Sequence, residues 1–108
     1  MREIKTPADF NEVVSGDKPV LLDFYADWCG PCQALLPIVE ELAQKHQDDF
    51  VIAKVNVDQN RELAGQFGVR SIPALFFIQD GEVKEQLLGL QPKQVLDRHI
   101  HMYLDKAA

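Results

Sequence analysis

Long apolar runs alternate along the chain with segments in which apolar residues recur every three or four positions. The runs over residues 20–26 and 50–57 are almost wholly apolar, which is typical of central strands that are covered on both faces. Residues 32–46 lie between these runs and carry leucine, valine and alanine at helical spacing, which predicts a long amphipathic helix. This strand–helix–strand unit constrains the helix to one side of the sheet, because such crossovers are almost always right-handed.

Capping residues indicate two shorter helices. Thr6, with Asp9 three residues later, has the pattern of a capping box, so we expect a helix over residues 7–14. Asn60 is expected to cap a second short helix over residues 61–67, because asparagine is a preferred N-cap residue.

The last third of the chain predicts a hairpin followed by a closing helix. Residues 74–79 and 83–88 are predicted to be strands joined across Asp80–Gly81, which is a strong signal for a hairpin turn. Residues 92–104 again carry an apolar stripe at helical spacing. Strands that alternate with helices and then end in a hairpin predict an α/β fold, a three-layer α/β/α sandwich with a central mixed β-sheet. We expect residues 1–108 to form a single domain.

Composition and charge exclude several classes of function. The chain carries 11 Lys and Arg against 17 Asp and Glu, a formal net charge of −6. Nucleic-acid-binding domains and polybasic membrane-surface proteins usually carry a positive surplus, so we expect neither class of partner. The longest apolar runs are far shorter than the roughly 20 residues that cross a bilayer, and residues 1–10 lack the pattern of a secretion signal. A cytoplasmic location is therefore expected.

The sequence Trp28-Cys29-Gly30-Pro31-Cys32 contains both cysteines of the chain, at the predicted junction between a strand and a helix. The free N–H groups and the positive end of the helix dipole stabilise an anion there, so Cys29 should ionise more easily than a free thiol. Cys32 lies about one helical turn further on, where it can attack a mixed disulfide formed on Cys29. The spacing therefore favours thiol–disulfide exchange.

A metal site is the main alternative for a pair of cysteines at this spacing. Zinc would need two further ligands, and the histidines of the chain are His46, His99 and His101. None of them lies near the cysteines in the sequence, and His99 is expected to pack at the boundary of the core. We therefore expect no metal at the cysteine pair.

The sequence resembles the thioredoxin family over essentially its whole length. The resemblance rests on the CGPC motif, on its flanking segments and on isolated residues in several predicted elements. These are Trp28 to Cys32, residues 20–26 with Asp23, Pro37, residues 54–58 with Lys54, residues 68–73, residues 80–82, and Gly89. The resemblance implies a thioredoxin fold and a protein-disulfide reductase that acts as an electron carrier in cell redox homeostasis.

The resemblance also implies roles for four residues. Cys29 would be the attacking nucleophile and Cys32 the resolving thiol, joined as a redox-active disulfide in the oxidised protein. Asp23 would be the buried acid that accepts a proton from Cys32, and Lys54 would lie near this acid and tune it. Two simpler readings remain open: Asp23 as a structural acid satisfied by hydrogen bonds, and Lys54 as a cation with no catalytic effect.

A docking surface around Cys29 is implied in the same way. Pro73 resembles the family's cis-proline, and the backbone of Ile72 would pair with an extended substrate segment. The implied substrate-binding residues are Trp28, Gly30, Pro31, Ile72, Pro73 and Gly89.

The implied partners are disulfide-containing proteins and a flavoprotein thioredoxin reductase that supplies electrons from NADPH. No cofactor would be bound by the chain, and a monomer is expected. Three rival functions stay open. The first is an oxidase or isomerase on the same fold, and the second is a thioredoxin-fold binding module or co-chaperone in which redox activity is secondary. The third is a metal or iron–sulfur site that bridges two chains through their cysteine pairs.

Four residues depart from the common pattern of the family. Tyr25 stands where tryptophan is frequent, and Gln33 stands where lysine is frequent. Ser71 and Ala74 replace glycine and threonine beside the implied cis-proline. These changes alter the rim of the docking surface and leave the cysteine pair intact.

Overall fold

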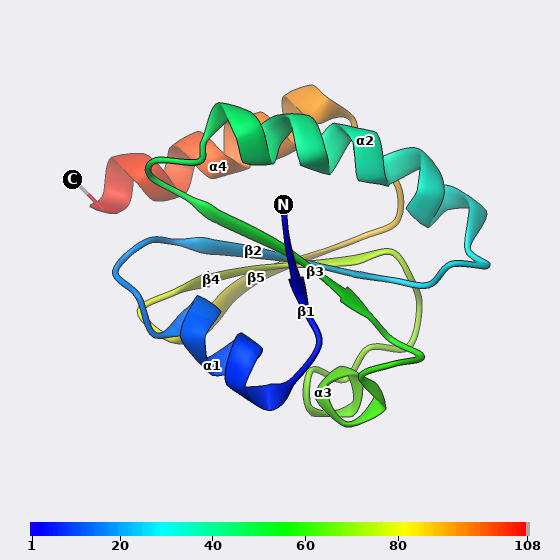
Figure 1. Ribbon diagram of the computed structural model, residues 1–108. Coiled ribbons are helices and arrows are strands. Elements are labelled where there is room, and N and C mark those ends of the chain that lie inside the picture. Colours follow the sequence, from blue (N-terminus) through cyan, green and yellow to red (C-terminus); the bar gives the residue numbers. More distant parts are fainter. Residues whose placement is uncertain (108) are drawn as a thin grey trace.

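A five-stranded sheet with helices on both faces forms the protein in the computed structural model, which describes residues 1–107 (Figure 1). Ala108, the last residue of the expected domain, lies outside the described residues. The elements in chain order are β1 (Arg2–Ile4), α1 (Pro7–Val14), β2 (Val20–Tyr25), α2 (Gly30–Lys45), β3 (Val51–Asn56), α3 (Arg61–Gln66), β4 (Ala74–Gln79), β5 (Glu82–Leu88) and α4 (Lys93–Ala107).

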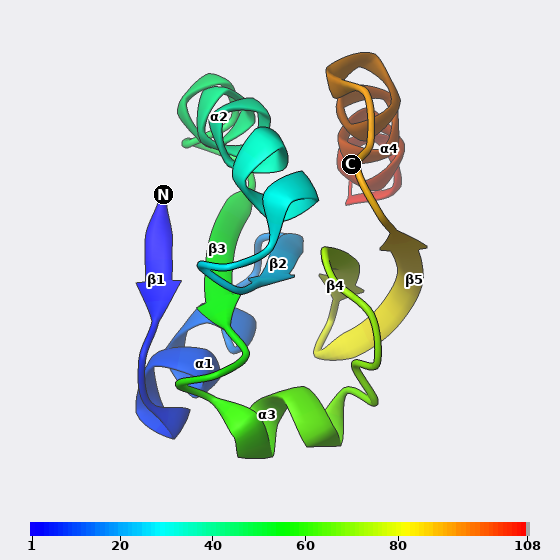
Figure 2. The same ribbon diagram turned by 90° about the vertical axis from the view of Figure 1, so that its right-hand side faces the viewer.

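The sheet is mixed, and its strands follow the spatial order β1-β3-β2-β4-β5. Strands β1, β2 and β3 run parallel, whereas β4 is antiparallel to both β2 and β5. Helices α2 and α4 cover one face of the sheet, and α1 and α3 cover the other (Figure 2). The predicted three-layer α/β/α sandwich with a central mixed sheet is confirmed.

Strand β1 is an element that the sequence pattern did not predict. It is a three-residue strand with one buried side chain, Ile4, and it pairs with β3 at the edge of the sheet. So short a segment shows no period of two, and only the pairing with β3 defines it.

The two predicted helix caps have different outcomes. Thr6 and Asp9 form the expected capping box: the Asp9 N–H donates to Thr6 Oγ1 at 3.1 Å, and the Asp9 carboxylate accepts from the Thr6 N–H at 3.2 Å. Asn60 is the N-cap residue of α3, as predicted, but its side chain makes no capping bond to that helix. The Asn60 amide instead donates to the carbonyl oxygens of Ile4 and Asn56, so it links the end of β1 to the end of β3.

The side chains of β2 alternate between two apolar clusters. Leu22 and Phe24 pack in the cluster beneath α1 and α3, and Leu21 packs in the cluster beneath α2 and α4. Since successive strand residues point to opposite faces, Asp23 lies on the same face as Leu21, toward the layer of α2 and α4. All six residues of β2 are buried, so the core positions an ionisable group directly below this helical layer.

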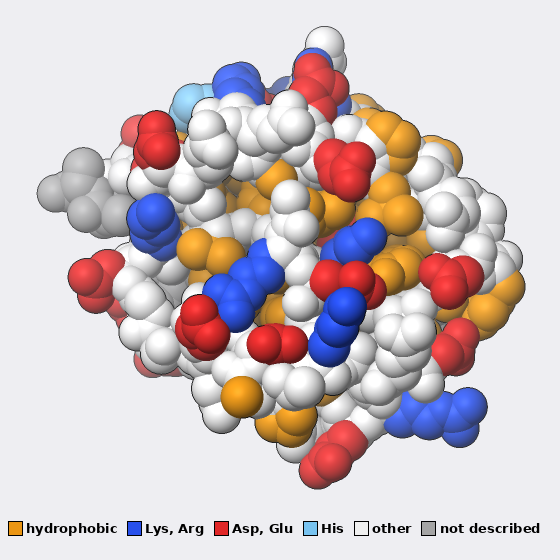
Figure 3. Space-filling model, viewed as in Figure 1, with side chains coloured by type: hydrophobic (Ala, Val, Ile, Leu, Met, Phe, Trp, Pro, Cys, Tyr) orange, Lys and Arg blue, Asp and Glu red, His pale blue; other side chains and the backbone are white. Residues whose placement is uncertain are grey.

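Charged side chains of both signs are interspersed on the face seen in Figure 3, with apolar side chains between them. The acids Glu40, Glu41, Asp48 and Asp49 are all exposed to solvent. The net charge of −6 is therefore not gathered into one block on this face.

Candidate active site

The two cysteines lie where β2 ends and α2 begins. Cys29 is the N-cap residue of α2, and Gly30 and Pro31 are its first helical residues. The helix thus begins two residues earlier than the predicted 32–46, because the cysteine itself caps it. Cys29 and Cys32 form a disulfide with a Cα–Cα distance of 5.2 Å, and the Cys32 N–H donates to Cys29 Sγ at 3.3 Å.

The two cysteines differ in exposure. Cys29 retains 6% of its accessible surface and Cys32 retains none. Both pack with Tyr25 and Ala26 in a small buried cluster that Val57 and Ile72 complete. A partner approaching from solvent therefore reaches Cys29 first, and α2 shields Cys32 behind it.

A cis peptide bond between Ile72 and Pro73 lies beside the cysteines, as the resemblance implied. The Ile72 carbonyl oxygen lies 3.8 Å from Cys29 Sγ, and the Pro73 carbonyl accepts from the Gly89 N–H at 2.9 Å. Gly89 has a φ of 83°, a backbone conformation that favours glycine. The start of β4 and the end of β5 thus bring Ile72, Pro73 and Gly89 together beside Cys29 Sγ.

Asp23 is fully buried, and among the described residues neither of its carboxylate oxygens has a hydrogen-bond partner. Its cross-strand neighbours are Lys54 on β3 and Leu75 on β4. Desolvation raises the pKa of Asp23 to about 7, and the positive charge of Lys54 opposes part of this rise. The reading of Asp23 as an acid satisfied by hydrogen bonds therefore has no support in these contacts.

Lys54 is held by an aromatic ring as well as by its place opposite Asp23. Its Nζ lies 5.5 Å from the centre of the Tyr25 ring, within the range of a cation–π contact. The Tyr25 hydroxyl donates to Glu3 Oε2 at 2.9 Å. Burial raises the pKa of Tyr25 to about 12, and the hydrogen bond to Glu3 is the second largest cause of this rise. Glu3 was not among the predicted site residues, since 22 positions separate it from Tyr25.

Trp28 is the most exposed apolar side chain at the rim, with 72% of its surface accessible. Its Nε1 donates to Asp58 Oδ2 at 2.8 Å, and the Asn56 side chain fixes the loop by accepting from the Asp58 N–H at 2.9 Å. Gly30 and Pro31 are also exposed. Asp58 and Asn56 were not among the predicted site residues, because they act through contacts between separate segments.

The other side of the rim is less open. Ile72 and Gly89 are half-buried, and Pro73 is buried. Leu88 and Leu90, which flank Gly89, are more than half exposed, at 55% and 51%. These two leucines extend the apolar surface beyond the residues that the resemblance implied.

The histidines do not lie with the cysteines. His46 follows the last residue of α2, and 16 helical residues at 1.5 Å each place it about 24 Å from Cys29. His99 stacks on Phe77 and bonds Glu85 through Nδ1 at 2.9 Å, as expected of a residue at the core boundary. The histidines of the chain therefore supply no ligand next to Cys29 and Cys32.

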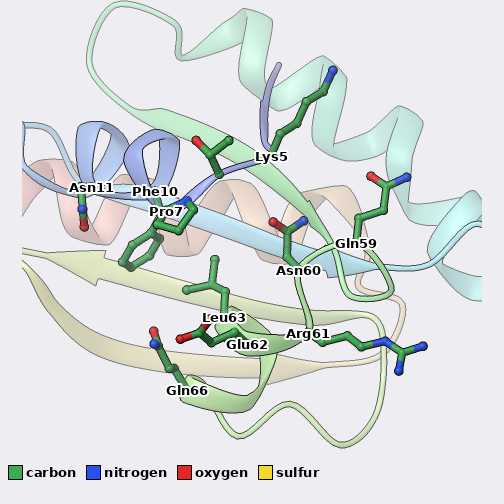
Figure 4. Close-up of a pocket in the computed structure, with 11 residues that line it drawn as sticks. Lys5, Pro7, Phe10, Asn11, Gln59, Asn60, Arg61, Glu62, Leu63 and Gln66 are labelled. Carbon is green, nitrogen blue, oxygen red and sulfur yellow. The ribbon is translucent and has the colours of Figure 1, made fainter.

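A cavity of about 420 Å³ lies between α1 and α3, on the sheet face opposite to α2. Figure 4 shows polar side chains around it, including Lys5, Asn60 and Arg61, with Phe10 and Leu63 as its apolar wall. None of its lining residues belongs to the cysteine site. Exchange between sulfur atoms needs an accessible sulfur rather than a deep cavity, so this hollow is not part of the site.

An α/β sandwich with a disulfide at the N-terminus of its central helix, beside a cis-proline, defines a thiol–disulfide oxidoreductase. The sequence matches the family described as Thioredoxin over residues 2–102. It is 47% identical over 95 residues to the thioredoxin of Alicyclobacillus acidocaldarius, which covers 88% of this chain and 90% of that protein. It is 44% identical over 93 residues to the thioredoxin of Chlorobaculum thiosulfatiphilum, which covers 86% of each.

Solved structures agree with these sequence matches. A mutant thioredoxin from Halobacterium salinarum superposes with a TM-score of 0.87 at 44% identity, covering 94% of this chain and 88% of that one. The thioredoxin of Malassezia sympodialis gives a TM-score of 0.88 at 30% identity and covers 100% and 91%. This chain belongs to the thioredoxin family.

Membership and the cysteine pair together establish the chemistry. The chain is a protein-disulfide reductase that works by dithiol–disulfide exchange, and the reading as a binding module is not favoured. Members of the family act on disulfide substrates and need no bound cofactor. Within residues 1–107, no helix is long and apolar enough to cross a bilayer.

Proposed function

We propose that Cys29 attacks the substrate disulfide and that Cys32 resolves the resulting mixed disulfide. The observation that carries this assignment is the difference in exposure, 6% for Cys29 against 0% for Cys32. The Cys29 thiolate forms a bond to one substrate sulfur, and the other substrate sulfur leaves with the bonding electron pair. The Cys32 thiolate then attacks Cys29 Sγ, which forms the intramolecular disulfide and releases the second substrate thiolate.

Asp23 is proposed to accept the proton that Cys32 loses before it attacks. A general base works best when its pKa is close to the operating pH, and burial raises the pKa of Asp23 to about 7. Asp23 lies on the strand that leads to the cysteines and faces the layer that contains α2. Lys54 is proposed to limit the rise in the pKa of Asp23, since its positive charge favours the ionised carboxylate.

Substrates are proposed to dock on the rim around Cys29. Trp28, Gly30 and Pro31 supply the exposed part of this surface. The backbone of Ile72 is proposed to pair with an extended substrate segment, since its carbonyl lies 3.8 Å from the sulfur. Pro73 and Gly89 hold that backbone in place through the bond between the Gly89 N–H and the Pro73 carbonyl.

Electrons are proposed to come from NADPH through a flavoprotein thioredoxin reductase. In this role the protein is a monomeric electron carrier of the cytoplasm that contributes to cell redox homeostasis, with residues 1–108 as a single domain. The family match over residues 2–102 supports this assignment.

The direct test is turnover of a model protein disulfide with NADPH and a thioredoxin reductase. We expect turnover by the wild type and none by Cys29→Ser, because the serine hydroxyl does not attack a disulfide. Cys32→Ser, the matched control, keeps the nucleophile and should accumulate a mixed disulfide that mass spectrometry detects. Trapping by Cys29→Ser in place of Cys32→Ser would reverse the assigned roles.

The reduction potential separates a reductase from an oxidase or isomerase on the same fold. Equilibration with glutathione buffers should give a value below the glutathione couple. A potential well above that couple would contradict the proposed direction of electron flow.

A further inference from the structure

At the end of α2 opposite to the cysteines, a histidine that follows α2 and a histidine of α4 converge on one carboxylate of α4. His46 Nε2 lies 2.8 Å from Asp97 Oδ1, and His101 Nε2 lies 3.6 Å from Asp97 Oδ2. Asp97 and His101 lie four residues apart on α4, so they share one face of that helix. Helices α2 and α4 run side by side in both ribbon views (Figures 1 and 2). One candidate ligand atom from each of the three side chains can be chosen so that all three atoms lie within 4.8 Å of one another.

We propose that His46, Asp97 and His101 form a binding site for a divalent transition-metal ion of the zinc type, with water as its fourth ligand. Two imidazoles and one carboxylate are a common ligand set for Zn²⁺. Bonds of about 2.1 Å in a tetrahedral arrangement place neighbouring ligand atoms about 3.4 Å apart. The His–Asp separations of 2.8 and 3.6 Å bracket that value. The widest separation among the three ligand atoms, at most 4.8 Å, closes by up to about 1.4 Å when the ion binds.

His46, the residue that follows α2, is held in place by burial and by a ring contact. The His46 side chain is 6% exposed, and its ring contacts the His101 ring edge to face at 5.3 Å. Its second ring nitrogen, Nδ1, lies 3.9 Å from Asp49 Oδ1. A carboxylate on the far side of a ligating imidazole fixes the tautomer that presents the other nitrogen to the metal. At 3.9 Å Asp49 does not yet hydrogen-bond this nitrogen, and a shift of about 1 Å would bring it into that supporting position.

Lys45 is the group that opposes metal binding. Its Nζ bonds both oxygens of Asp97, at 3.1 and 3.0 Å, and occupies part of the space around the carboxylate. The Lys45 side chain is 55% exposed, so it can swing into solvent when an ion arrives. Because Lys45 competes with the metal for Asp97, a variant that lacks the Lys45 ammonium group should bind the metal more tightly than the wild type.

The site is separate from the exchange chemistry. The length of α2 places His46 about 24 Å from Cys29, so the ion would tie the end of α2 to α4 without touching the cysteines. An ion that binds only the folded chain also stabilises it. The cluster has no local signal in the sequence, because His46 and Asp97 are 51 positions apart.

The test is titration of the oxidised protein with ZnCl₂ by calorimetry, and with Co²⁺ by visible absorption. Oxidation removes the cysteine thiolates, which would otherwise bind both metals, so failure here leaves the exchange proposal untouched. We expect one ion per chain, a tetrahedral Co²⁺ spectrum, and an affinity about ten-fold or more weaker in His101→Gln and in Asp97→Asn. His101 is exposed, so its replacement tests the site without risk to folding.

Two further variants sharpen the result. His99→Gln removes a histidine that bonds another acid, Glu85, and should bind Zn²⁺ as the wild type does. Lys45→Met should bind several-fold more tightly than the wild type. The proposal is overturned by a lack of binding at millimolar Zn²⁺, by full binding in His101→Gln, by equal weakening in His99→Gln, or by unchanged or weaker binding in Lys45→Met.

Discussion

Replacement of Asp23 by asparagine should stabilise the oxidised protein, and the gain should grow as the pH rises. Asparagine keeps the shape of the side chain and removes the charge that burial disfavours. Asp23 has an ordinary pKa of 3.8 and a folded-state pKa of about 7. The folded protein therefore binds the proton more tightly than the unfolded chain does. Ionisation of Asp23 accordingly lowers the free energy of unfolding as the pH rises from about 4 to above 7.

The size of the effect follows from the difference between the two pKa values. The two pKa values differ by about 3, and a difference of 1 corresponds to 1.36 kcal/mol. Ionisation of Asp23 should therefore lower the free energy of unfolding by about 4 kcal/mol above pH 8, by less than about 2 kcal/mol at pH 5, and by almost nothing at pH 3. The difference in free energy of unfolding between Asp23→Asn and the wild type should change with pH by these amounts. The contributions of other titrating groups cancel, because both proteins contain them. The disulfide is kept intact so that Cys29 and Cys32 do not titrate in the folded protein.

Urea unfolding at about pH 4, 6 and 8 measures this difference, with the m-value checked for constancy. Asp48→Asn is the matched control, because it removes an exposed carboxyl and should change stability by less than about 0.5 kcal/mol throughout. The same Asp23→Asn protein should turn over a model disulfide more slowly at neutral pH. A stability difference that stays constant with pH would refute the raised pKa, and unchanged turnover would refute the proton-accepting role.

Three further substitutions test separate contacts. Thr6→Ala should lower the free energy of unfolding by about 1 kcal/mol, because the bond from the Asp9 N–H is lost; an unchanged urea midpoint would contradict this. Lys54→Met should raise the pKa of Asp23 further by removing the opposing charge, which an NMR titration of the Asp23 carboxyl in the oxidised protein measures; an unshifted or lower midpoint would contradict it. Phe77→Ala should cost about 3–5 kcal/mol, because Phe77 is fully buried in the cluster beneath α2 and α4; thermal unfolding checks this, and a loss below about 1 kcal/mol would show that the core closes around the gap.

The main elements of the fold could be predicted because their signals are local. The apolar run that became β2 and the Thr6 capping box depend on residues a few positions apart. Strand β1 and the side chain of Asn60 could not be predicted in this way. β1 exists through its pairing with β3, and the Asn60 amide prefers the Ile4 and Asn56 carbonyls to the end of α3.

In the candidate site, too, residues with a local sequence signal could be predicted and residues held by remote contacts could not. Cys29, Cys32 and Asp23 stand out in the sequence because two are neighbouring thiols and one is an acid in an apolar run. The groups that hold the site are remote in sequence: Glu3 lies 22 positions from the Tyr25 it bonds. Such partners depend on which strand edges and loops meet, and no short pattern encodes that.

The burial of Asp23 argues for a role in chemistry rather than in folding. A deficit of about 4 kcal/mol at high pH is a large share of the 5–15 kcal/mol by which domains of this size are usually stable. A structural acid would offset that loss with hydrogen bonds, but the described residues supply none to either oxygen. Its flanking strand residues, Leu22 and Phe24, complete an apolar cluster on the other face that needs no charge. Destabilising groups of this kind are retained mainly where function requires them. The strand that carries Asp23 leads directly to the redox-active disulfide at the start of α2.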